Sequence, residues 1–199
     1  MPGIARYLTH PQVDLDPNKA VPQWSLNEVG LARVAALAKQ LGVLHATTRV
    51  ISSDENKALE TAIPIANALG ITVEVRPKMH ENDRSSTGFL TPSEFEHVAD
   101  QFFSNPTESV RGWEMAIEAQ RRIMLEVEEC LVGHVTGDVL FVGHGGVGTL
   151  LFCGLNALQI DRKFDQGPGG GGFWFEFTIS DRKTSGGWMP LESLNLDLV

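Results

Sequence analysis

The stretch DVLFVGHGGVG, residues 138–148, carries the strongest structural signal in the chain. Its first six residues, 138–143, are almost all apolar, which is typical of a central strand that is buried on both faces of a sheet. His144 follows directly, and a pair of glycines then begins the apolar segment VGTLLFCGL. The stretch therefore predicts a buried strand that leads at once into a helix, as in α/β folds.

Two further strand–helix repeats are predicted in the N-terminal part of the chain. Short β-rich runs alternate there with apolar residues at helical spacing, and this β-α-β-α-β order is typical of a mostly parallel sheet with helices on its faces. Capping boxes at residues 25–28 and 52–55 are expected to begin the helices, and Gly42 and Gly70 to end them. The predicted strands are residues 3–9, 48–51 and 71–75.

The C-terminal half adds a cap and an antiparallel edge strand. Residues 76–115 are predicted to form a loop-and-helix cap, in which Thr91 begins a short helix. A longer helix is expected over residues 111–131. The run FWFEFTIS, residues 173–180, alternates like an edge strand and is expected to turn at residues 181–187 into a hairpin. An exposed edge there favours a homodimer.

Composition narrows the classes of partner. The 199 residues fit a single domain over 1–199, and a net charge of −9 disfavours nucleic acid and anionic membranes as partners. No apolar run reaches the roughly 20 residues that span a bilayer. No signal peptide is recognised, and the two cysteines lack a CxxC neighbour, so a cytoplasmic location is expected. The six histidines show no metal-ligand spacing, so neither a metal nor another cofactor is expected.

Chemically useful residues follow the predicted strands. His10, the helix start at 52–57, the loop that holds Glu81, and His144 all come after a strand. The carboxyl ends of parallel strands meet at one edge of a sheet, which is where such folds bind ligands. A neutral imidazole can attack phosphorus, a carboxylic acid can protonate a leaving oxygen, and cations or helix N-termini can hold phosphoryl oxygens. This set of residues therefore fits phosphoryl transfer.

Four ordered segments carry a family resemblance: YLTHPQV (7–13), SSDENKALETA (52–62), MHEND (79–83) and VLFVGHGGV (139–147). They resemble the motifs of the histidine phosphatase superfamily, the phosphoglycerate-mutase-like group. The resemblance implies a three-layer α/β/α sandwich and hydrolysis of a small phosphomonoester through a phosphohistidine. It also implies that His10 is the nucleophile, that His144 stabilises the phosphoryl group, and that Glu81 donates the proton.

The chain departs from the family pattern at two positions. Thr9 stands where the family has an arginine directly before the nucleophile, and Lys57 replaces an arginine in the second motif. Arginine holds phosphate with a planar fork, whereas lysine offers a point charge and threonine a hydroxyl. Arg84 and Arg111 are candidates for a replacement cation. The residues expected to bind phosphate are Thr9, Lys57, Arg84 and Gly145.

Other interpretations remain open at this stage. The two departures favour a catalytically weak or inactive member that binds a phosphorylated ligand or partner. A phosphoglycerate-mutase-type phosphotransferase is disfavoured, because the chain lacks an obvious extra insert to retain a bisphosphate. Residues 143–148 also fit G-x-G-x-x-G, but the next parallel strand ending in an acidic residue is missing. Asp14 and Asp16 resemble an aspartyl-phosphate pair, yet they lie in mid-loop.

Overall fold

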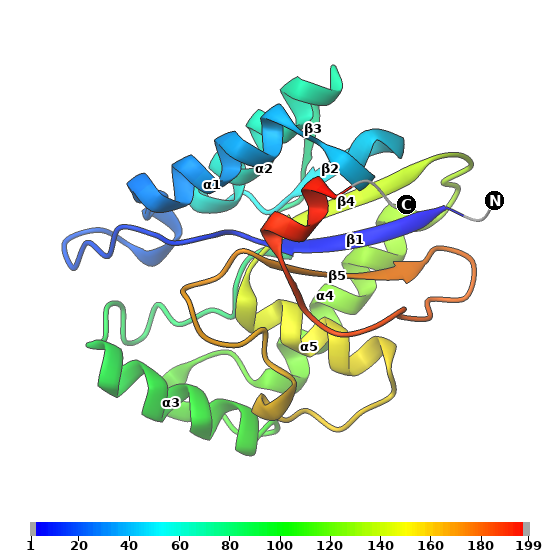
Figure 1. Ribbon diagram of the computed structural model, residues 1–199. Coiled ribbons are helices and arrows are strands. Elements are labelled where there is room, and N and C mark those ends of the chain that lie inside the picture. Colours follow the sequence, from blue (N-terminus) through cyan, green and yellow to red (C-terminus); the bar gives the residue numbers. More distant parts are fainter. Residues whose placement is uncertain (1–2, 197–199) are drawn as a thin grey trace.

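A computed structural model describes residues 3–196 of the chain. Within them the sheet has six strands in the order β3-β2-β4-β1-β5-β6 (Figure 1). Strands β1 to β4 pair in parallel, and β5 and β6 run antiparallel to their neighbours. This confirms the predicted mostly parallel α/β sheet with an antiparallel edge. The strands are β1 (Ile4–Thr9), β2 (Thr47–Ser52), β3 (Val73–Val75), β4 (Asp138–Gly143), β5 (Phe173–Thr178) and β6 (Met189–Pro190).

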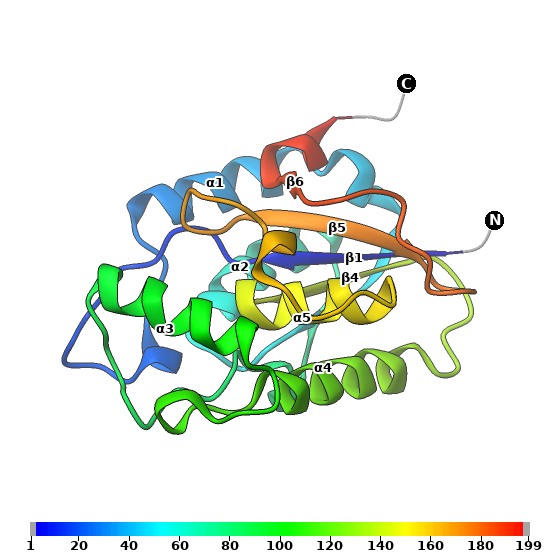
Figure 2. The same ribbon diagram turned by 90° about the horizontal axis from the view of Figure 1, so that it is seen from below.

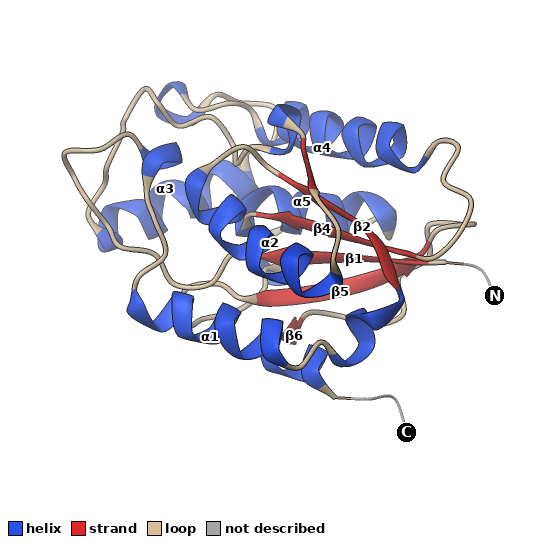
Figure 3. Ribbon diagram, turned by 90° about the horizontal axis from the view of Figure 1, so that it is seen from above, coloured by secondary structure: helices blue, strands red, loops and turns tan. Residues whose placement is uncertain are grey.

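Helices cover both faces of the sheet, which gives three layers. Helices α1 and α2 pack on one face, and α4 and α5 pack on the other (Figures 1 and 3). No helix within residues 3–196 has both the length and the apolar character needed to span a membrane. The helices are α1 (Glu28–Lys39), α2 (Asn56–Leu69), α3 (Pro92–Ser104), α4 (Ala116–Leu131) and α5 (Gly145–Leu155).

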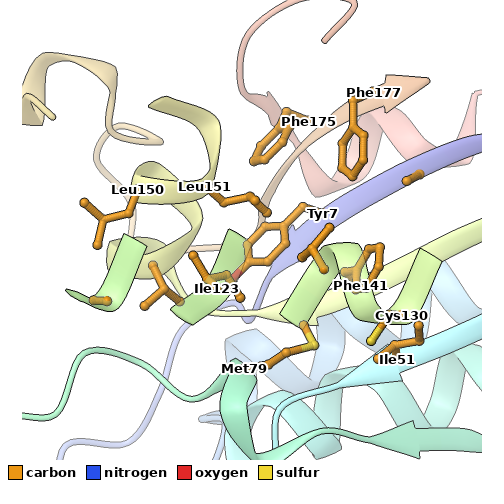
Figure 4. Close-up of a cluster of buried hydrophobic side chains, with 14 of the residues drawn as sticks. Tyr7, Ile51, Met79, Ile123, Cys130, Phe141, Leu150, Leu151, Phe175 and Phe177 are labelled. Atoms are coloured by element: carbon orange, nitrogen blue, oxygen red, sulfur yellow. The ribbon is translucent and has the colours of Figure 1, made fainter. Parts of the chain in front are cut away.

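Strand β4 lies between β1 and β2 and is buried on both faces, as its apolar run predicts. Alternate residues feed the two cores. Phe141 joins the cluster beneath α4 and α5, whereas Leu140 joins the one beneath α1 and α2. Figure 4 shows the Tyr7 ring amid the first cluster, where it stacks on Phe175 with ring centroids 5.6 Å apart.

Helix boundaries differ from the predictions at three places. Asn27 rather than Ser25 begins α1, because its side chain accepts the Gly30 N–H at 3.0 Å. Helix α1 ends at Lys39, and Gly42 instead opens a short 3₁₀ helix, Gly42–Ala46, with φ +48°. Gly70 does end α2 in the left-handed conformation. The predicted 111–131 helix begins only at Ala116.

The second predicted capping box, at residues 52–55, does not form. Helix α2 begins at Asn56, and Glu55 is its N-cap residue without a side-chain cap hydrogen bond. The Glu55 carboxylate instead pairs with Lys57 in the interior. A buried ion pair thus takes the side chain that the local pattern assigned to helix capping.

Strand β5 is not a free edge. Its Phe173 and Trp174 pair with β6, and Phe177 forms a bridge with Thr184. The hairpin predicted at residues 181–187 is therefore present. Because β6 and the returning chain cover β5, the exposed edge that suggested a homodimer is absent from the described part of the chain.

The cap expected at residues 76–115 contains α3 and two short 3₁₀ helices, Pro77–Met79 and Val110–Gly112. The capping box predicted at Thr91 is present. In Figures 1 and 2 α3 lies beyond the carboxyl ends of β1 and β4. The cap therefore faces the edge of the sheet where His10 and His144 emerge.

The packing of α4 gives a test of this architecture. Ile123, on the inner face of α4, is fully buried, whereas Leu125, two residues further along the same helix, is 61% exposed. We expect Ile123→Ala to lower the free energy of unfolding by about 2–5 kcal/mol, since it removes buried methylenes and leaves a cavity. Leu125→Ala should change it by less than about 0.5 kcal/mol. Urea denaturation of both variants checks this; equal losses would contradict the packing described.

Candidate active site

The sheet brings His10 and His144 side by side. His10 follows β1 and His144 follows β4, and the register of these parallel strands pairs Thr9 with Gly143. The His10 N–H donates to the Gly143 carbonyl at 3.0 Å. The two imidazole centroids lie 5.3 Å apart with an interplanar angle of 67°. Strand pairing thus joins two residues that are far apart in the sequence.

The hydrogen bond of His10 defines its tautomer. Its Nδ1 lies 2.8 Å from the Pro11 carbonyl oxygen, which can only accept, so Nδ1 carries the hydrogen. Nε2 then keeps a free lone pair. Burial, helped by the positive charge of Lys57, lowers the pKa of His10 to about 4. The ring is therefore neutral and nucleophilic at pH 7.

His144 is completely buried and is held from several sides. Its Nε2 lies 2.9 Å from Ser53 Oγ and 3.5 Å from Glu55 Oε1, while its Nδ1 has no hydrogen-bond partner within residues 3–196. The Tyr7 hydroxyl accepts the His144 backbone N–H at 3.1 Å and donates to its carbonyl at 3.2 Å. Desolvation holds the pKa of His144 well below its usual value.

The glycines of the VGHGGVG segment make room for neighbouring side chains. A Cβ at Gly143 would lie 2.3 Å from the Tyr7 hydroxyl oxygen, and one at Gly148 would lie 2.6 Å from the Tyr7 ring. One at Gly145 would lie 2.4 Å from Gln166 Nε2. These close approaches give the glycines a role in packing around the histidines, which replaces the dinucleotide-binding interpretation of G-x-G-x-x-G.

Glu55 is a site residue that the sequence interpretation missed. Only 5% exposed, it pairs with Lys57 through Oε2, and its Oε1 accepts the Glu81 backbone N–H at 2.8 Å. Burial opposes its negative charge, but His144 and Lys57 outweigh burial and bring the pKa of Glu55 down to about 2. Its position between Ser53 and Lys57 in the second motif could have indicated a site residue, but we assigned its side chain to a capping box instead.

Lys57 points into the cavity but is not a free cation. It contacts the Glu55 carboxylate, and its Nζ donates to the Val21 carbonyl at 3.1 Å. An anionic ligand must therefore share Lys57 with Glu55. Lys57 lines the cavity, so its contact with phosphate stays a prediction, and its pairing with Glu55 reduces the charge that it offers to a ligand.

Glu81 lies at the N-terminus of α5. Its carboxylate accepts the N–H groups of Gly146 and Val147 at 3.0 and 2.9 Å. A carboxylate is favourable there because the helix N-terminus carries partial positive charge. The side chain lines the same cavity as His10, where we predicted the proton donor.

Arg84 is a second cation of the cavity, which Arg162 also lines while paired with Glu96 and Asp100. Its guanidinium lies 4.7 Å from the Phe95 ring centroid and 5.7 Å from that of Trp24. Its Nε is buried without a hydrogen-bond partner within residues 3–196, and burial lowers its pKa. Arg111, the other candidate replacement cation, is exposed and does not line the cavity.

Thr9 is placed differently from the prediction. It is completely buried, and its hydroxyl accepts the backbone N–H groups of Gly172 and Phe173 while it donates to Gln166 Oε1. With its hydrogen and both lone pairs used, Thr9 has no bonding capacity left for a phosphate ligand. Gly145 does line the cavity, as the first residue of α5.

One cavity of about 670 Å³ is lined by several of these groups, whereas the buried Thr9, Glu55 and His144 lie behind its lining. The strand ends supply its polar floor, and the cap supplies apolar walls that include Phe89, Phe95 and Trp113. The glycine-rich segment 167–171 closes a further side. The residues that it shares with the predicted site are His10, Lys57, Glu81, Arg84 and Gly145.

Similar solved structures share this fold. Bacillus stearothermophilus YhfR aligns with a TM-score of 0.76 at 19% identity, over 92% of this chain and 94% of its own. A mycobacterial glucosyl-3-phosphoglycerate phosphatase with inorganic phosphate aligns at 0.75 and 20%, over 98% and 100%. An Entamoeba histolytica phosphoserine phosphatase mutant with phosphoserine aligns at 0.72 and 17%, over 93% and 96%. No curated protein matches.

A family model matches most of the chain. The model of the histidine phosphatase superfamily (branch 1) aligns with residues 12–170. The match contains the second, third and fourth motifs. It begins at residue 12, so Thr9 and His10 of the first motif lie just outside it. His10 lies just outside the matched residues, but the pairing of β1 with β4 places it against His144 of the fourth motif. The chain belongs to the histidine phosphatase superfamily, branch 1.

Proposed function

We propose that this protein hydrolyses small phosphomonoesters through a phosphohistidine on His10. One observation carries the proposal: a neutral His10, with a free Nε2 lone pair, lies beside the buried His144 and lines a cavity together with the cationic side chains of Lys57 and Arg84. These groups match what phosphoryl transfer to nitrogen needs, namely a nucleophile and positive charge around the phosphoryl oxygens.

The reaction has two steps. His10 Nε2 attacks phosphorus, the N–P bond forms, and the P–O bond to the leaving group breaks while Glu81 supplies a proton to the departing oxygen. Water then attacks the phosphohistidine and gives its proton to the Glu81 carboxylate, so the N–P bond breaks, inorganic phosphate leaves, and the neutral imidazole and the acid form of Glu81 are restored. Lys57, Arg84 and the start of α5 at Gly145 surround the phosphoryl oxygens, and His144 stabilises their charge.

A second candidate, binding of a phosphorylated ligand without turnover, is favoured by the Glu55–Lys57 pair. Lys57 and Arg84 carry two positive charges, and the Glu55 and Glu81 carboxylates bring two negative charges into the same region. This balance lowers the attraction for a phosphate dianion and for the charge that develops during transfer. Measured turnover separates the two candidates.

The proposal includes a small phosphorylated substrate, a cytoplasmic location and no nucleic-acid partner. Cys130 and Cys153 are both free and buried, which fits a reducing compartment. The net charge of −9 supports the exclusion of nucleic acid. A homodimer stays a prediction, now without the exposed strand edge that suggested it.

Substitution of His10 tests the reaction directly. We expect His10→Ala to lower kcat/KM for aryl phosphates by more than about 10³-fold, because the neighbouring imidazole of His144 is fully buried and its Nε2 is held by Ser53. His45→Ala, which removes an exposed histidine from the 3₁₀ helix Gly42–Ala46, should leave kcat/KM unchanged. A panel of phosphomonoesters assayed with all three proteins checks this. Equal rates for wild type and His10→Ala would overturn catalysis by His10.

Titration of His10 tests its protonation state. We expect its imidazole signals in NMR, assigned by their loss in His10→Ala, to titrate with a midpoint near pH 4. The unfolded chain binds this proton at about pH 6.5. Protonation therefore favours unfolding, and His10 contributes a loss of stability as the pH falls from about 6.5 to about 4. A midpoint near 6.5 would show that the ring is not desolvated as described.

Substitution of the two candidate cations tests which of them meets phosphate. We expect Arg84→Ala to weaken binding of inorganic phosphate about 10- to 100-fold, as for the loss of a charged hydrogen bond. Arg111→Ala, the matched control outside the cavity, should bind like wild type. Isothermal titration calorimetry at fixed ionic strength measures both. Unchanged affinity in Arg84→Ala would remove Arg84 from the phosphate site.

A further inference from the structure

The hydrogen bonds of Thr9 connect it to Gln166, which lies outside the four sequence motifs. Thr9 Oγ1 accepts two backbone N–H groups, from Gly172 at 3.1 Å and Phe173 at 3.0 Å. Its own hydrogen has two acceptors in reach, Gln166 Oε1 at 2.6 Å and the Phe173 carbonyl oxygen at 3.2 Å, and the shorter distance favours Gln166. That separation is typical of an O–H···O bond rather than an N–H···O bond. Thr9 therefore holds the oxygen of the Gln166 amide.

This bond fixes the direction of the other end of the amide. With Oε1 bound to Thr9, the Gln166 NH₂ group lies against Gly145, where a Cβ would come within 2.4 Å of Nε2. Gly145 directly follows His144 and begins α5. Within residues 3–196, Nε2 has no hydrogen-bond acceptor, and Gln166 lines the same cavity as His10 and Lys57.

The backbone of Gln166 is also anchored. Its N–H donates to Asp165 Oδ1 at 2.7 Å, and the same oxygen lies 3.0 Å from the Thr149 hydroxyl of α5, which also has the Gly145 carbonyl within reach at 2.9 Å. Side chain and main chain are thus tied to β1 through Thr9 and to α5 through Asp165. A side chain whose amide oxygen and backbone are both held presents its free NH₂ donors without a large ordering cost on binding.

We propose that Gln166 Nε2 donates to an oxygen of the transferring phosphoryl group and that Thr9 is the residue that positions it. This inference rests on the proposed function of His10. An amide NH₂ offers two hydrogens but no charge. Gln166 therefore supplies hydrogen bonds beside the nucleophile, where the family resemblance places an arginine, and leaves the charge to Arg84 and the shared Lys57.

Variants of Gln166 test the contact. We expect Gln166→Ala to weaken binding of inorganic phosphate and to lower kcat/KM for aryl phosphates, each about 3- to 10-fold, as for the loss of a neutral hydrogen bond. Gln166→Glu keeps the shape but replaces the donors with a negative charge, so it should lose more than the alanine variant.

Gln12→Ala is the matched control, because Gln12 Nε2 donates to the Gly169 carbonyl at 2.6 Å and so anchors the same glycine-rich segment. If Gln166 contacts phosphate, Gln12→Ala should keep wild-type phosphate affinity. Equal losses in Gln12→Ala and Gln166→Ala would show that Gln166 only holds the loop, which overturns the inference.

The positioning role of Thr9 has its own test. Thr9→Ser keeps the hydroxyl and should retain wild-type phosphate affinity, whereas Thr9→Val should lose about as much as Gln166→Ala. The double variant Thr9→Val/Gln166→Ala should lose little more than either single one, because both act on one contact. Fully additive losses, or loss of affinity in Thr9→Ser, would overturn the positioning role.

The outcomes separate this inference from the proposed function. If His10→Ala abolishes turnover while Gln166→Ala binds phosphate and turns over like wild type, the inference fails and the phosphohistidine proposal stands. If His10→Ala retains wild-type rates, the phosphohistidine proposal fails together with the inference. If Gln166→Ala and Gln166→Glu show the graded losses stated above and Gln12→Ala does not, the contact is established.

Discussion

The parallel pairing of β1 with β4 is the constraint on which the site depends. The register that aligns Thr9 with Gly143 makes both strands end together, so the residues that follow are two neighbouring histidines. The Tyr7 hydroxyl, inside β1, bonds both the N–H and the carbonyl of His144. The central strands therefore fix the geometry of the histidine pair, and the surrounding loops add further side chains around it.

A balance of positive and negative charge is the second property of the site. The buried Glu55 carboxylate offsets the charge of Lys57 and accepts the backbone N–H of Glu81. It also lies 3.5 Å from His144 Nε2, so one acidic side chain connects three residues of the site. Unpaired cations in a cavity of low dielectric would hold product phosphate tightly. We expect a pocket in which Lys57 is already paired to bind phosphate more weakly, with Arg84 as the main source of unshared positive charge.

Sequence patterns predicted what depends on local or periodic signals. The bounds of β4, the end of α2 at Gly70 and the capping box at Thr91 agree with the structure, because each follows from apolar runs or helix-end chemistry over a few residues. The pattern failed at Glu55. A capping box satisfies backbone N–H groups, but burying Lys57 without a counter-charge costs far more than a lost cap, so the ion pair takes the carboxylate.

No local or periodic signal in the sequence could predict that Gln166 is the hydrogen-bond partner of Thr9. Thr9 and Gln166 are separated by 157 positions, and the segment after Gln166 is glycine-rich without a period. What the sequence does show is the departure itself, a threonine directly before His10. A hydroxyl is much shorter than the guanidinium that it replaces, and here it binds a second side chain, Gln166, that lines the cavity and that we propose as a phosphoryl contact. Where a motif loses a long cationic residue, the search for its replacement should therefore follow the hydrogen bonds of the shorter residue into the fold.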